Sequence, residues 1–163
     1  MKKRGGFTLL ELLIVIAIIA ILASIIYEAI NPVRRLAEAK NADRWAAVNS
    51  ILNAILKYTI DNGGTLPGDL ESASTGTNYV LGTGGAGGCL DINCPAVVNS
   101  ENCLNLTSQL VDKYFSSIPF DRTRGSSSNT YYYVSKSVNG RITVGACWPE
   151  AIDGVTPTIN VSR

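Results

Sequence analysis

The chain has 163 residues, of which 46% are hydrophobic and 17% are charged, and its 14 basic and 13 acidic side chains nearly balance. That balance argues against nucleic acid as a direct partner, because neutralising phosphates requires a basic face. The sequence contains no histidine, which excludes an imidazole base, ligand or pH switch. We find no catalytic set, metal-ligand motif or cofactor motif, and therefore expect no catalytic residues, no metal and no cofactor.

The N-terminal segment is long and apolar enough to cross a membrane. Residues 7–27 form a stretch of 21 residues, about 31 Å as a helix, and residues 12–26 carry no charge. A secretory signal has a shorter apolar region followed by a small-residue cleavage site, whereas here the helical pattern continues. Hydropathy alone favours a single-pass anchor. Basic residues lie on both sides of the span, so the positive-inside rule favours an internal N-terminus only weakly.

Glu11 is the one residue that a simple anchor does not explain. It lies five residues into the apolar run, and no basic residue occurs between Phe7 and Ile30 to pair with it. A carboxylate costs about 2.5–3.5 kcal/mol at the bilayer centre and less near the end of the span. An ionisable residue inside a membrane segment indicates a function, and the alternative is that Glu11 only marks the membrane boundary.

The residues around Glu11 carry a resemblance to a known family. The run KKRGG at residues 2–6, followed by FTLLE at residues 7–11 and an apolar helix, resembles the class III signal and N-terminus of type IV prepilins. The resemblance is close over residues 1–61 and loose beyond them. It implies that a prepilin peptidase cuts between Gly6 and Phe7 and methylates the new Phe7 amine. It also implies that Glu11 pairs with the N-terminal amine of an adjoining subunit.

The end of the apolar segment departs from the family pattern. Many members carry glycine where this chain has Ala20 and proline where it has Glu28. The only proline of the helix region is Pro32, whose missing N–H would have bonded the carbonyl of Glu28. One interpretation is a kink between Glu28 and Pro32. The other is a second helix that starts here, with Asn31 as its N-cap and Pro32 at its first position.

Residues 33–61 change from an all-apolar to an amphipathic pattern. Asn62 and two following glycines then form a stop signal. The apolar side chains recur at helical spacing and are expected to pack on a sheet: Leu36, Trp45, Val48, Ile51, Leu52, Ile55, Leu56 and Ile60. The polar side chains are assigned to the opposite, solvated side: Arg34, Glu38, Asp43, Arg44, Asn49, Asn53 and Lys57.

The C-terminal part predicts loops and a small antiparallel sheet. Residues 72–88 hold six Gly and five Ser or Thr, and the run from Gly84 to Gly88 is expected to form a flexible surface loop. A short helix is expected at residues 104–115. Strands at residues 130–135 and 141–147 flank Asn139-Gly140, a strong hairpin signal. Residues 155–161 fit an edge strand, because Pro157 cannot donate to a ladder. The fold class is therefore α+β and pilin-like, with a long N-terminal helix packed on this sheet.

The four cysteines are expected to form two disulfides. They are Cys89, Cys94, Cys103 and Cys147, an even number that favours disulfides in an exported domain and allows three pairings. Their spacing and the lack of histidine fit a zinc site poorly. We expect at least one bond to tether the loop between Cys89 and Cys103.

The resemblance predicts four regions and a function. Residues 1–6 are a leader removed by the peptidase, residues 7–32 a membrane and filament-core helix, residues 33–62 an amphipathic helix, and residues 63–163 the loops and sheet of a head. The chain is expected to be a structural subunit of a type IV pilus, not an enzyme. It would start as a single-pass precursor in the cytoplasmic membrane and end in an extracellular surface filament.

The partners implied are identical or homologous pilin subunits, prepilin peptidase, the inner-membrane assembly machinery, and membrane lipid before assembly. Two alternatives remain open from the sequence. One is a pseudopilin of a type II secretion system, which acts as a short periplasmic piston. The other, from a different class, is a bitopic membrane protein with a ligand-binding ectodomain.

Overall fold

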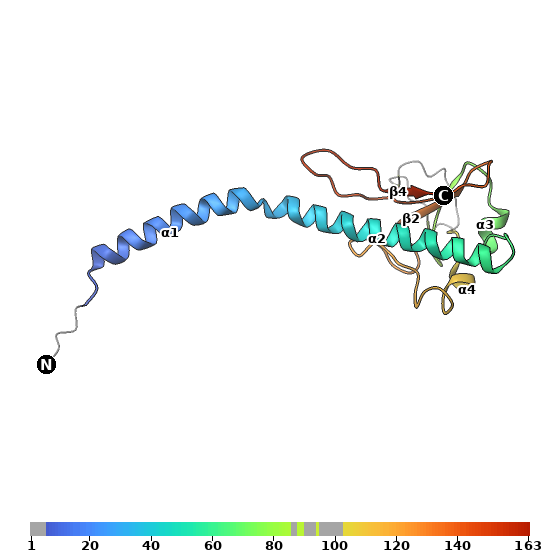
Figure 1. The fold of residues 1–163 in the computed structure, drawn as a ribbon, viewed down its shortest axis with the longest axis horizontal. Coiled ribbons are helices and arrows are strands. Elements are labelled where there is room, and N and C mark those ends of the chain that lie inside the picture. The colour runs from blue at the N-terminus through green and yellow to red at the C-terminus, as the bar shows by residue number, and fades with distance from the viewer. Residues whose placement is uncertain (1–5, 86–87, 90–93, 95–102) are drawn as a thin grey trace.

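The computed structural model describes residues 6–85, 88–89, 94 and 103–163. Its fold is α+β, as the sequence predicts, with a long N-terminal helical rod and a small antiparallel sheet. In Figure 1 the first helix, α1 (Leu9–Ile30), projects away from the rest of the chain, and the second, α2 (Pro32–Asp61), lies along the sheet. We call α1 the stalk, and α2 with everything after it the head.

The boundary between α1 and α2 falls at Asn31. This residue has a left-handed backbone, with φ 41° and ψ 77°, so the helical hydrogen bonding of α1 stops there. Its side chain accepts a hydrogen bond from the N–H of Arg34 at 3.3 Å, and Pro32 occupies the first position of α2. The structure therefore has the second of the two arrangements that the sequence allows, a new helix capped by Asn31, while Glu28 stays within α1.

The sheet has four strands in the order β1-β2-β3-β4, and every neighbouring pair is antiparallel. The predicted hairpin is confirmed as β2 (Tyr132–Lys136) and β3 (Ile142–Ala146), with Gly140 at φ 75° in the turn. The edge strand β4 (Asn160–Ser162) pairs with β3, and Pro157 lies before it. The other edge is β1 (Asn78–Val80), a strand that the sequence did not predict.

Two short helices complete the head, and both differ from the sequence prediction. The helix α3 (Gly68–Ser72) was not predicted. The helix expected at residues 104–115 is reduced to α4 (Thr107–Leu110). Leu104 forms a bridge with Leu81 instead, and the chain turns extended at Val111 before Asp112 adopts φ 70°.

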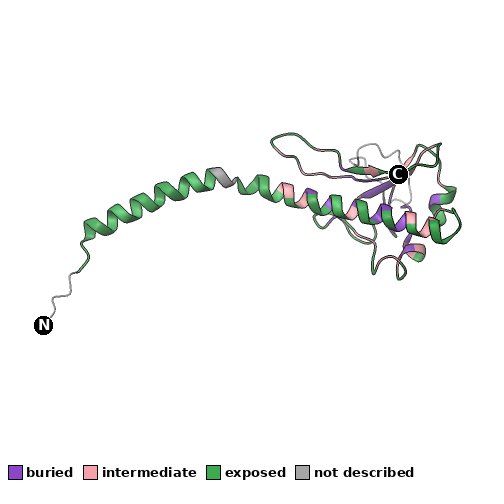
Figure 2. Ribbon diagram, in the orientation of Figure 1, coloured by how far each residue is buried: buried purple, intermediate pink, exposed green. Residues whose placement is uncertain are grey.

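The core lies between α2 and one face of the sheet. Its largest fully buried side chains on α2 are those of Ile51, Leu52 and Ile55, which pack against aliphatic residues of β2 and β3. Figure 2 shows buried positions on α2 and the strands, while the described side chains of α1 are exposed. Burying each large aliphatic side chain contributes about 1.5–3 kcal/mol, so this contact is the main source of stability in the head.

The apolar stripe of α2 is narrower than the sequence predicts. Leu36 and Ile60 are 59% and 79% exposed, and Trp45 is 39% exposed. At about 100° per residue, Leu36 and Ile60 point away from the line defined by Val48 and Ile55, and the contact with the sheet does not extend to them. The prediction for Arg44 was wrong in the opposite direction. This residue was assigned to the solvated side of the helix, but it is only 2% exposed.

The other face of the sheet carries a second, smaller cluster. It contains Val80 and Tyr133 together with all four cysteines. Tyr133 is paired across the ladder with Gly145, and its ring occupies the space where a Cβ at that position would lie. Glycine at position 145 is therefore needed to let the Tyr133 ring lie flat against the strand.

Candidate processing and assembly site

The expected cleavage site lies in accessible backbone ahead of α1. Gly6 and Phe7 precede the first helical turn, both are exposed, and Phe7 is 80% exposed. Apart from Gly6 and its two neighbours in the chain, no described residue has a heavy atom within 4 Å of the point where a Cβ on Gly6 would lie. A protease can therefore approach this peptide bond without displacing any part of the described chain.

Glu11 is held at the start of α1 by a reciprocal capping arrangement with Thr8. The backbone N–H and the hydroxyl of Thr8 both donate to Glu11 Oε2, at 2.9 and 2.8 Å. The N–H of Glu11 donates back to Thr8 Oγ1 at 3.2 Å. This capping box satisfies two of the free donors at the helix N-terminus and turns the carboxylate toward the end of the helix where Phe7 lies.

The capping box does not neutralise the charge of Glu11. Among the described residues Glu11 has no salt bridge, and Oε1 accepts no hydrogen bond. Its surroundings on α1 are apolar side chains that nothing in the described chain covers. A carboxylate that leaves water for such surroundings needs a cation, and none of the described residues places one beside it.

The stalk is suited to lipid or to copies of itself. Within the described residues, one helical stretch is long and apolar enough to span a membrane, and it begins at Leu9. The 22 residues of α1 extend about 33 Å, close to the thickness of a hydrocarbon core. Each described side chain of α1 is exposed, so its apolar surface requires a partner outside the subunit.

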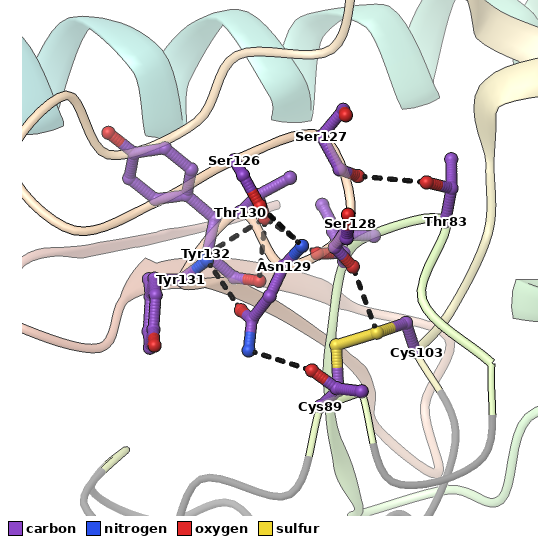
Figure 3. The surroundings of a disulfide bond; sticks show 12 residues. Thr83, Cys89, Cys103, Ser126, Ser127, Ser128, Asn129, Thr130, Tyr131 and Tyr132 are labelled. Atoms are coloured by element: carbon purple, nitrogen blue, oxygen red, sulfur yellow. Dashed lines mark hydrogen bonds between the residues drawn. A yellow bond between two sulfur atoms is a disulfide. The ribbon is translucent and has the colours of Figure 1, made fainter.

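The disulfides tie the loop region to the sheet. Cys89 is bonded to Cys103, and Cys94 to Cys147, which selects one of the three pairings that the sequence leaves open. Figure 3 shows the first bond beside residues 126–132, where Cys103 Sγ lies 3.2 Å from the carbonyl oxygen of Ser128. The side-chain amide of Asn129 donates to the carbonyl of Gly88 at 3.1 Å. The second bond fastens the loop region to the end of β3.

A buried ion-pair network, which the sequence analysis missed, joins α2 to two loops of the head. Arg44 Nε lies 2.6 Å from Asp121 Oδ2, and both side chains are 2% exposed. Arg44 Nη2 also lies 3.4 Å from Glu150 Oε1. Asn41 completes the network, because its side chain exchanges two hydrogen bonds of 2.8 Å with the backbone of Glu150. The network therefore fixes both loops against the helix.

Hydrogen bonding decides the ionisation of Asp121. Burial alone would raise the pKa of this carboxyl, but hydrogen bonds from the Arg44 guanidinium and the Thr123 N–H, at 2.6 and 2.7 Å, together lower the pKa below its ordinary value. The signal for this network was present in the sequence. Asn41 and Arg44 precede Val48 at spacings of seven and four residues, so they continue the buried stripe of α2.

The described residues combine an apolar helix, a capped carboxylate near its start and an α+β head, which fits a membrane-anchored precursor. Residues 1–27 match the family model of the prokaryotic N-terminal methylation motif. That motif is the class III signal peptide of type IV pilins, and it supports a precursor of the pilin or pseudopilin type. No curated protein and no solved structure matches the chain significantly.

Proposed function

We propose that the chain is a structural subunit of a type IV pilus. The observation that carries the proposal is the combination of an accessible Gly6–Phe7 bond, the methylation motif and a stalk whose apolar surface is not covered by any described residue. The precursor sits in the cytoplasmic membrane through α1. Prepilin peptidase removes residues 1–6 and methylates Phe7, and the assembly machinery then packs the stalks into a filament core with the heads outside.

In this proposal Glu11 sets the axial register of the filament. After cleavage, the positive amine of Phe7 and the Glu11 carboxylate both enter an apolar bundle. An isolated buried ion costs several kcal/mol, whereas a close pair of opposite charges recovers much of that cost. An incoming subunit is therefore most stable at the depth where its amine meets the free Glu11 oxygen of a neighbour.

The direct test is to isolate sheared surface filaments and sequence the N-terminus of their subunit. We expect filaments built from this chain, with a subunit that begins at methylated Phe7. A processed chain that stays in the periplasm without surface filaments would favour a pseudopilin of a type II secretion system. An intact Met1 in the membrane fraction would contradict both and favour a bitopic anchor.

The structure allows the charge of Glu11 to be separated from its capping role. Glu11→Gln keeps an oxygen that caps the helix but removes the charge, whereas Thr8→Ala removes the capping box but keeps the charge. We expect Glu11→Gln and Glu11→Val to be cleaved after Gly6 but to yield few or disordered filaments, with Glu11→Asp intermediate. Thr8→Ala should assemble nearly normally. Filament yield, measured by electron microscopy and by the sheared protein fraction, decides between the two roles.

The opposite pattern would contradict the register model. If Glu11→Gln and Glu11→Val strains make normal numbers of ordered filaments, Glu11 is a boundary or capping residue and attracts no neighbour. Cleavage is scored separately, by the mass of the membrane-bound chain, so a processing defect is not mistaken for an assembly defect.

A further inference from the structure

A pocket opens between α2 and the segment at residues 119–123 of the head. Its volume is about 330 Å³, near the lower end of the range for small-molecule sites. On the helix side the small side chains of Ala46 and Ala47 leave the space, and on the other side Phe120 and Tyr132 form aromatic walls. The assembly of a filament through α1 uses none of these residues.

Tyr132 presents a polar group in this pocket that the subunit does not use. Most of the residue is buried, and its hydroxyl makes no hydrogen bond to the residues that the structure describes. Figure 3 shows its ring extending from β2 toward the overlying helix. Burial raises the pKa of Tyr132 to about 12, so the hydroxyl remains a neutral donor and acceptor at physiological pH. The hydroxyl is not among the fully buried polar atoms that lack a partner, so it reaches the open space of the pocket, where a ligand can bind it in place of water.

The charged groups around the pocket favour a ligand without net charge. Arg44 and Asp121 at its inner side already pair with each other, and Lys40 pairs with Glu150 at 3.3 Å. The two remaining groups are Asp43 on α2 and Arg122 on the opposite segment. Both are exposed, neither has an ion-pair partner in the described part of the chain, and their charges are opposite. An ionic ligand would leave one of the two uncompensated.

We propose that this pocket binds a neutral sugar, as a free monosaccharide or as the terminal ring of a glycan. Each sugar hydroxyl both donates and accepts, so one ring can donate to the Asp43 carboxylate and accept from the Arg122 guanidinium and the Tyr132 hydroxyl. Phe120 is 43% exposed. The negative face of its aromatic ring attracts the weakly positive C–H groups of a sugar ring. The pocket therefore supplies polar groups on both sides and an apolar wall, which is the combination that a sugar presents.

The experiment uses the full chain in micelles of a phosphocholine detergent, which has no sugar head group. Methyl β-galactoside, methyl α-mannoside and N-acetylglucosamine are each added up to about 20 mM, and saturation-transfer NMR reports binding. We expect at least one of them to bind with a Kd of about 1 mM, as is usual for a small ligand in an open pocket. Tyr132→Phe, which removes only the hydroxyl, should weaken binding about tenfold.

Matched variants separate the pocket from the fold. Tyr133→Phe removes a hydroxyl from the opposite face of the same strand, and Arg141→Ala removes an exposed arginine at the β2–β3 turn; both should bind like the parent. Arg122→Ala and Phe120→Ala alter only exposed side chains of the pocket and should also weaken binding. If Tyr132→Phe lowers the melting temperature, sugar binding by Arg122→Ala and Phe120→Ala tests the proposal in its place.

Three results would overturn the proposal. The first is that none of the three sugars gives saturation transfer at about 20 mM. The second is that a sugar binds equally to the parent, to Arg122→Ala and to Phe120→Ala. The third is that a zwitterionic amino acid such as alanine binds in the pocket while the sugars do not, because Asp43 and Arg122 would then recognise opposite charges rather than hydroxyl groups.

Discussion

The two faces of the sheet are covered in different ways. On one face α2 buries a stripe of large aliphatic side chains, and one ion pair closes its edge. The other face buries one tyrosine, one valine and two disulfides, with Tyr131 and Trp148 partly buried beside them. The segment that leads into the first cysteine, residues 82–88, holds five glycines in seven residues and has little apolar area to bury. Where the sequence cannot supply a hydrophobic contact, covalent cross-links take over the same task.

The largest expected effect lies on the helix face. Ile55 is fully buried against the sheet, so Ile55→Asp places a carboxylate in the core and should unfold the head, a loss of more than about 3 kcal/mol. Tryptophan fluorescence of the full chain in micelles reports on the head alone, because both tryptophans, Trp45 and Trp148, lie there. Ile60→Asp, at a position 79% exposed, is the control and should melt like the parent. Equal stability of both variants would place the core elsewhere.

The ion pair at the edge of that face should give the next largest effect. Arg44→Ala leaves Asp121 buried without its cation, which typically costs about 3–5 kcal/mol. Urea unfolding of the full chain in micelles measures this loss, and the exposed Arg35→Ala is the control, for which we expect no measurable change. Replacing both partners, as Arg44→Met with Asp121→Leu, should restore much of the stability. If the double variant is no better than Arg44→Ala, shape rather than unpaired charge explains the loss.

The disulfide face should respond to reduction rather than to apolar substitution. Removing the bond to β3 with Cys94→Ala and Cys147→Ala should cost about 2–4 kcal/mol, mainly because the unfolded chain gains freedom. Reductant should destabilise the parent by at least the amount that the double variant loses. The same reductant should destabilise the double variant less than it destabilises the parent. An unfolding curve of the parent that is the same with and without reductant would show that the cross-links do not hold this face.

Acid should produce the smallest and most selective effect, again on the helix face. The pKa of Asp121 is lowered in the folded state, so its contribution to stability is fully present above the unfolded-state pKa of about 3.9. That contribution is lost as the pH falls through the lower folded-state value. Stability measured by urea between pH 5 and pH 2 should therefore decline less in Asp121→Asn than in the parent. Parallel declines would assign the acid sensitivity to other carboxylates.

The parts of this fold that the sequence predicts are those with a local signal. The apolar run of α1 and the Asn139-Gly140 hairpin both follow from residues that are adjacent in the chain. The strand β1 was missed because three residues pair with a strand more than fifty positions away. The burial of Arg44 was missed because an arginine was assumed to face water, although its position continues the buried stripe of α2. Its partners, Asp121 and Glu150, could not be named because they are distant in sequence.

The same distinction between local and distant signals decides which parts of the candidate sites could be predicted. Gly6, Phe7 and Glu11 belong to one contiguous motif and could be named from the sequence. The capping of Glu11 by Thr8 was within reach too, because threonine followed three residues later by glutamate is a capping-box pattern. The sugar pocket could not be predicted, since α2, β2 and residues 119–123 meet only in the folded head.

The order of the cysteine pairs has a consequence for how the chain survives damage. The bonds from Cys89 to Cys103 and from Cys94 to Cys147 overlap along the sequence, so neither closed ring lies wholly inside the other. A single cut of the backbone anywhere between the first and the last cysteine is therefore always spanned by at least one bond. The nicked subunit stays one molecule until it is reduced, and in a polymer of such subunits a cut of this kind would release no fragment.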